Sequence, residues 1–164
     1  MRLLQSVLPT LRQTKKPQQK FVAHLLGLLL MLPGHATFRN LSRYNSYHER
    51  TFARWYARDF DFVSLNKTAI TRGMSPEHEQ ALVIDASFIA KSGKKTYGLD
   101  RFWNGSHRRT AKGLEISALA WLDITDSCAY GLSVEQTPPT PKTTDPEATR
   151  LDVYLDQLTR VVSE

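Results

Sequence analysis

Asp85 is the residue whose surroundings most clearly call for a chemical explanation. It is the only carboxylate in a run of apolar and small residues at positions 81–90, ALVIDASFIA, a pattern that predicts a buried β-strand. A carboxylate in such a strand is costly unless it is paired, hydrogen-bonded or bound to a metal ion. Two interpretations follow from this run: Asp85 is a metal ligand, or it caps the turn at the end of the strand.

The segment after this strand is strongly basic. Positions 91–112 contain seven Lys or Arg residues and one acid, interleaved with Phe102 and Trp103. We expect a flexible loop here that binds nucleic-acid phosphates, because clustered cations favour polyanions. The expected DNA contacts are Lys91, Lys94, Lys95, Arg108 and Arg109. The SGKK sequence is not a P-loop, since GxxxxGK[ST] is absent.

A second group of cations lies in a segment that predicts two short helices, at about 37–44 and 47–58, joined by a turn at Asn45-Ser46. Ser46 and Glu49 have the spacing of a capping box at the start of the second helix. This helix carries an apolar stripe of Phe52, Trp55 and Tyr56, and a different face carries Arg50, Arg54 and Arg58. Such a helix suits contact with DNA, although a solvated basic face would have the same pattern.

The other expected elements frame these two segments. A buried helix at 21–32 ends at Pro33-Gly34; it is shorter than the roughly 20 residues that a bilayer span needs, so no membrane partner and a cytoplasmic location are expected. A hairpin follows at 113–124 and 128–135, with Asp123 and Asp126 at its turn and Glu115 on the solvent face. A last helix is expected to start at about Asp145.

Composition narrows the class of protein. The 164 residues include 22 Lys or Arg and 16 Asp or Glu, a formal net charge of +6, which points to a polyanionic partner. A single cysteine excludes a disulfide framework and a thiolate zinc site within one chain.

Two stretches carry a resemblance to the DDE transposases of bacterial insertion sequences. The start of their catalytic domain resembles VIDASFIAKSGKKTYGLDRFWNGSHRRTAKGLEISALAWLDI, and their helical N-terminal region resembles FRNLSRYNSYHERTFARWYARDFDF. The resemblance implies an RNase H-like catalytic domain that cleaves and transfers strands at transposon ends. It also implies two Mg²⁺ ions held by Asp, Asp and Glu, double-stranded DNA as the partner, and a homodimer.

Within this family pattern, Asp85 matches the first aspartate, and no residue matches the second aspartate or the glutamate. We therefore expect an α+β chain that holds a helical DNA-binding region and the first strands and helix of a truncated RNase H-like domain. The expected organisation is a basic arm at 1–20, a helix-turn-helix-like region at 21–62, a linker at 63–80 and the incomplete catalytic domain at 81–164. The alternative is a non-catalytic DNA-binding protein, either a regulator or an inhibitor of transposition.

Overall fold

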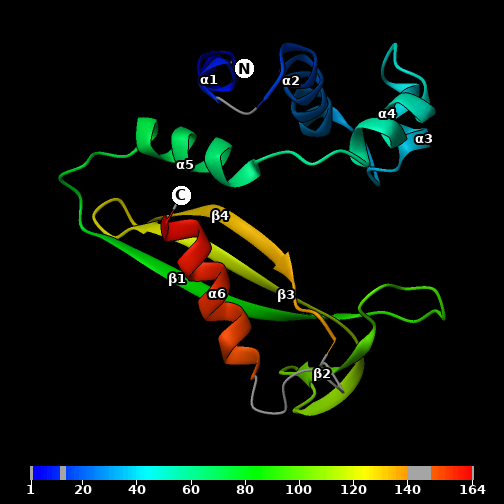
Figure 1. Cartoon of the computed structure of the whole chain (residues 1–164), viewed down its shortest axis with the longest axis vertical. Helices are drawn as coiled ribbons and strands as arrows, with labels where there is room; N and C mark the ends of the chain where they lie inside the picture. Colours follow the sequence, from blue (N-terminus) through cyan, green and yellow to red (C-terminus); the bar gives the residue numbers. More distant parts are fainter. Residues whose placement is uncertain (1, 12–13, 140–148, 164) are drawn as a thin grey trace. The chain divides into compact units, whose positions relative to one another are not determined.

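The computed structural model describes residues 2–11, 14–139 and 149–163, and the chain divides into two compact units. Unit 1, residues 1–72, is helical where it is described. Unit 2, residues 73–164, contains a four-stranded antiparallel sheet and, among the described residues, one long helix at its C-terminal end (Figure 1). The chain is therefore α+β, as expected.

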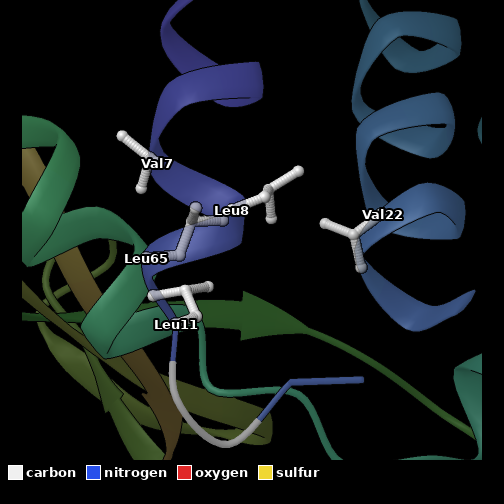
Figure 2. Close-up of a cluster of buried hydrophobic side chains, with 5 residues drawn as sticks. All are labelled: Val7, Leu8, Leu11, Val22 and Leu65. Carbon is white, nitrogen blue, oxygen red and sulfur yellow. The ribbon is translucent and has the colours of Figure 1, made fainter. Parts of the chain in front are cut away.

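Unit 1 begins with residues that pack into its core. These are α1 (Arg2–Val7), a 3₁₀ turn (Leu8–Thr10) and α2 (Lys16–Met31). Val7, Leu8 and Leu11 are buried in one cluster with Val22 of α2 and Leu65 of a later helix, and Figure 2 shows the Leu8 and Val22 side chains pointing toward each other. Apolar residues in the segment expected to be a basic arm, 1–20, thus anchor it to the unit.

Helix α2 begins five residues before the predicted start at 21 and ends one residue before the predicted end at 32. None of the helices in the described part of the chain combines the length and apolarity that a bilayer crossing requires.

The two short helices of the basic segment form as predicted, as α3 (Phe38–Arg43) and α4 (Glu49–Tyr56). Phe52 is buried with Phe21, and the Trp55 ring stacks on the Phe21 ring with 5.1 Å between centroids. Tyr56, predicted to be in the core, is instead 80% exposed and contacts Phe38 at the edge of the unit. The apolar stripe that packs into the core therefore contains Phe52 and Trp55 but not Tyr56, which is the last residue of the helix.

The predicted capping box does not form. Helix α4 is capped by His48, whose Nδ1 accepts a hydrogen bond from the Arg50 backbone N–H at 3.2 Å. One turn earlier, Asn45 Oδ1 accepts from the Tyr47 N–H at 3.0 Å. This Asn45 turn shifts the helix start two residues beyond the position that a Ser46 cap requires.

The segment expected to be a linker, 63–80, is largely helical. Helix α5 (Phe62–Gly73) starts where Asp61 Oδ1 accepts from the Ser64 N–H at 2.8 Å, and it buries Leu65 and Ile70. The boundary between the two units falls at its C-terminal end. A carboxylate cap followed by apolar residues at helical spacing was the signal for this helix.

The sheet of unit 2 is organised around one long strand, β3 (Arg109–Asp123). Along residues 113–123 it pairs with β1 (Gln80–Ala90), and it also pairs with β2 (Asp100–Asn104) and β4 (Cys128–Gln136). The predicted strand at 81–90 and the predicted hairpin are confirmed. Strand β2 was not predicted, because it lies inside the segment interpreted as a loop.

Helix α6 (Arg150–Ser163) crosses one face of this sheet (Figure 1). The predicted start at Asp145 lies outside the described residues. Gln157 is buried at the centre of the contact, where its Oε1 accepts from Ser117 Oγ at 2.5 Å and its Nε2 donates to Ser133 Oγ at 3.2 Å. Leu151 and Leu155 of this helix are 62% and 49% exposed. Helix α6 thus buries one polar and one apolar residue, Gln157 and Val161.

Glu115 was expected to face solvent but is only 5% exposed, beneath α6. The Tyr154 hydroxyl donates to Glu115 Oε1 at 2.7 Å, and the Arg150 guanidinium lies 3.8 Å from Oε2. Burial, helped by the neighbouring carboxylate, raises the pKa of Tyr154 to about 12. These partners compensate the burial of the Glu115 charge.

Candidate nucleic-acid and metal-binding site

Asp85 lies on the face of the sheet opposite to α6. In β3, residues 113, 115, 117 and 119 are buried on the α6 side, and Ala118, which pairs with Asp85, lies between them. Because side chains alternate between the faces of a strand and directly paired residues share a face, Asp85 points away from α6. Its side chain is exposed and forms no hydrogen bond or ion pair among the described residues.

The prediction that β1 is a buried strand is therefore wrong. None of its eleven residues is buried, although its sequence is apolar. The reason is tertiary: β3 is the only described strand that pairs with β1, and even on the α6 side a β1 residue such as Ala86, which pairs with Ser117, remains exposed. Because Asp85 is exposed to solvent, its carboxylate is not desolvated and needs no partner to compensate for burial.

The cations of the segment 91–112 gather at one end of the sheet. Ala90 and Asp100 both pair with Gly113, so the loop that carries Lys91, Lys94 and Lys95 begins and ends at that position. This loop projects from the sheet in Figure 1. Arg108, in the turn after β2, and Arg109 lie beyond it, and all seven Lys and Arg side chains of the segment are exposed. None of them forms an ion pair within the described residues.

Asp85 and the cations are close enough to contact one DNA molecule. Gly113 is five residues from Ala118, the partner of Asp85, which corresponds to about 17 Å along an extended strand. The register also places Arg101 opposite Lys112 on the same face of the sheet as Asp85. The sequence reasoning did not assign Arg101 or Lys112 as contacts, because their face depends on β2 being a strand.

The base of the cationic loop is fixed by a glycine. Gly98 has φ of +70°, a conformation that residues with a side chain rarely adopt, and a Cβ there would collide with the Gln136 amide. The Gln136 Nε2 donates to the Tyr97 carbonyl at 3.1 Å. The loop is thus held to β4 at its C-terminal end.

The arginines of unit 1 are placed differently from the prediction. Arg50 and Arg54 lie one turn apart on α4 and are exposed, as expected. Arg58 lies beyond the end of the helix, and its guanidinium packs over the Trp55 ring at 4.4 Å from the centroid. The exposed face of α4 therefore carries two of the three predicted arginines, Arg50 and Arg54, and Arg58 contacts Trp55 instead.

A separate group of possible metal ligands lies at the other end of β3. One atom each from His78, Asp123 and Asp126 lie within 4.8 Å of one another, which is close enough to hold a metal ion. Both Asp123 oxygens already have partners: Oδ1 accepts from the Asp126 N–H at 2.9 Å, and Oδ2 lies 2.8 Å from His78 Nδ1. The prediction that Asp123 and Asp126 form the hairpin turn is confirmed.

This group does not supply the ligands that Asp85 lacks. Asp123 is five residues along β3 from Ala118 and has the register of the opposite face. The cluster of His78, Asp123 and Asp126 is the only group of three or more potential metal ligands among the described residues.

The His78–Asp123 contact makes the stability of unit 2 depend on pH. Its hydrogen bond to Asp123 raises the pKa of His78 above 6.5, and the Asp126 N–H and His78 lower the pKa of Asp123 below 3.8. The contribution of His78 to the stability of unit 2 is complete below pH 6.5 and is lost as the pH rises through the raised pKa of His78. The contribution of Asp123 is complete above pH 3.8 and is lost as the pH falls through the lowered pKa of Asp123. We therefore expect unit 2 to have its highest melting temperature at pH values between the lowered pKa of Asp123 and the raised pKa of His78.

Thermal unfolding followed by circular dichroism from pH 3 to 9, with EDTA present, measures this dependence. The variant His78→Gln should flatten the decline above about pH 6.5. His107→Gln, a change at an exposed histidine of the same unit, should keep the wild-type profile. An unchanged profile in His78→Gln would show that the pair contributes nothing.

The sequence matches the family of DDE superfamily endonucleases over residues 6–154. This match covers most of the chain, and the chain therefore belongs to the DDE superfamily of endonucleases. Members of this superfamily are metal-dependent nucleases that act on DNA. No curated protein and no solved structure matches the chain.

Proposed function

We propose that this chain is a transposase-type DDE protein that binds the DNA of transposon ends, with Asp85 as the first carboxylate of the metal site. The observation that carries the proposal is the register of the sheet: it puts Asp85, Arg101 and Lys112 on the face away from α6. The other exposed cations of the segment 91–112, which form no ion pair within the described part of the chain, lie at the end of the same sheet. A DNA strand held by those cations would extend along the sheet, so that a phosphate about five nucleotides further on, at about 3.4 Å per nucleotide, would lie near the carboxylate.

Unit 1 supports the DNA-binding part of the proposal. Helices α3 and α4 are joined by a short turn, and α4 is fixed by Phe52 and Trp55 while it presents Arg50 and Arg54. This arrangement suits insertion of α4 into a groove or its placement along the phosphate backbone. Binding by a homodimer to paired ends is a prediction that rests on the family resemblance alone.

The metal part of the proposal is limited by the surroundings of Asp85. Mg²⁺ takes oxygen ligands, and a carboxylate such as Asp85 suits it. Two-metal hydrolysis nevertheless needs several carboxylates to fix both ions, and no group of three or more possible His, Cys, Asp or Glu ligands among the described residues includes Asp85. We therefore propose that these 164 residues bind DNA without cleaving it.

The test separates binding from cleavage. In EDTA, the chain should shift a duplex that carries a transposon end, and Asp85→Asn should not weaken the shift, because it removes a negative charge that faces the DNA. With Mg²⁺ or Mn²⁺, a supercoiled plasmid should stay intact. Nicking that disappears in Asp85→Asn would contradict the proposed lack of cleavage and show a functional metal site.

The solitary position of Asp85 also favours a second candidate function, a non-catalytic DNA-binding protein. An inhibitor of transposition would bind the same transposon ends as an active relative and would compete with it there. A helix-turn-helix regulator would instead recognise an operator beside its own gene. Selection of bound fragments from genomic DNA distinguishes these two targets.

A further inference from the structure

Strands β2 and β3 together present an aromatic side chain and two cations on the face of the sheet away from α6. Phe102 points toward α6 and is completely buried, with the Arg150 guanidinium 4.6 Å from its ring centroid. Because side chains alternate along a strand, the neighbours Arg101 and Trp103 must point the other way. Trp103 is accordingly 54% exposed.

The cations beside Trp103 are held in place by β3. Trp103 pairs with Thr110, and the Arg101 guanidinium donates through Nη2 to the Thr110 carbonyl and hydroxyl at 3.2 and 3.4 Å. Arg101 therefore lies next to the indole on the same face, and Lys112, which pairs with Arg101, adds a second exposed charge. An aromatic ring flanked by cations is the arrangement that single-strand binding proteins use: bases stack on the ring and phosphates pair with the cations.

From this geometry we infer that Trp103, with Arg101 and Lys112, binds unpaired DNA bases. This inference rests on the proposed function and names the form of DNA that this part of the site takes. A duplex satisfies cations through its phosphates, but the faces of its bases are covered by their neighbours in the stack. An indole fixed on a sheet therefore contributes only when a base has left the duplex, as at a frayed end or in a single strand.

The experiment compares two probes by fluorescence anisotropy: labelled single-stranded dT20, and a blunt 20-base-pair duplex bearing the transposon end. Trp103→Ala should weaken binding of dT20 about tenfold and leave the affinity for the duplex unchanged. Trp103→Phe keeps an aromatic face and should restore most of the lost affinity. Leu151→Ala, which truncates a side chain that is 62% exposed on α6, should change neither affinity.

The outcomes distinguish this inference from the proposed function. If the wild-type chain binds both probes and Trp103→Ala binds dT20 as well as the wild type does, the stacking role is wrong and the DNA-binding proposal stands. An equal loss on both probes would show that Trp103 acts on duplex binding or on the fold, and would also overturn the inference. If the wild-type chain binds neither probe, both the inference and the proposed function fail.

Discussion

Replacing Lys91, Lys94, Lys95, Arg108 and Arg109 together by glutamine is expected to weaken binding of the transposon-end duplex on the order of 100-fold at 100 mM NaCl. All five side chains are exposed and have no acidic partner among the described residues, so they are available to phosphates. The dependence of log K on log[NaCl] should become shallower by about 4.5, because each of the five lost phosphate contacts removes about 0.9 from the slope. Titrations from 50 to 300 mM NaCl measure both quantities.

A charge-conserving variant is the matched control for this result. Exchanging Lys for Arg at 91, 94 and 95, and Arg for Lys at 108 and 109, keeps the positive charge and should keep the wild-type slope. Were the glutamine variant to retain the wild-type slope, the end of the sheet would not be the phosphate-binding surface. The DNA contacts would then have to come from unit 1.

Phe102→Ala is expected to have the largest effect on stability, a loss of about 3–5 kcal/mol in the free energy of unfolding of unit 2. Phe102 is completely buried and is the only buried side chain of β2, so its removal leaves a cavity beneath the Arg150 guanidinium. A loss of this size is comparable with the whole stability of a small domain, about 5–15 kcal/mol. Urea unfolding followed by circular dichroism measures it.

Trp103→Ala, one residue further along the strand, is the control for that measurement. Trp103 is larger than Phe102 but exposed, and an exposed truncation of this kind usually changes stability by about 0.5 kcal/mol or less. Similar losses in the two variants would show that β2 does not bury Phe102 selectively. The comparison also shows whether the Trp103 variant keeps its fold in the DNA-binding experiment.

Local pattern was sufficient to predict the elements that hold the candidate site, with the exception of β2. The apolar run at 81–90 became β1, and the alternating segments around Asp123 and Asp126 became the β3–β4 hairpin. The helices α3 and α4 follow from apolar residues at helical spacing. These predictions were confirmed because the type of an element follows from the periodicity of residues that are near one another in the sequence, even where, as for β1, the pairing partner is distant. The Ser46 cap was wrong because Asn45, a competing local partner, formed the turn instead.

The burial of each face could not be predicted in this way. An apolar run such as that of β1 usually signals burial on both sides, yet Asp85 is exposed because α6 packs on the other face. Glu115 shows the reverse case: a charged residue in a hairpin is expected to face solvent, but Tyr154 and Arg150 approach from a helix more than 30 positions away and compensate its burial.

The sequence by itself determined the family, the position of Asp85 in a strand, and the cations that follow it, since all three are properties of residue types in order along the chain. The tertiary structure alone decided that Phe102 points inward and Trp103 outward, and that Asp85 shares its face with Arg101 and Lys112. The physical reason is that alternation divides the side chains of a strand between two faces, but only packing against α6 determines which face is covered.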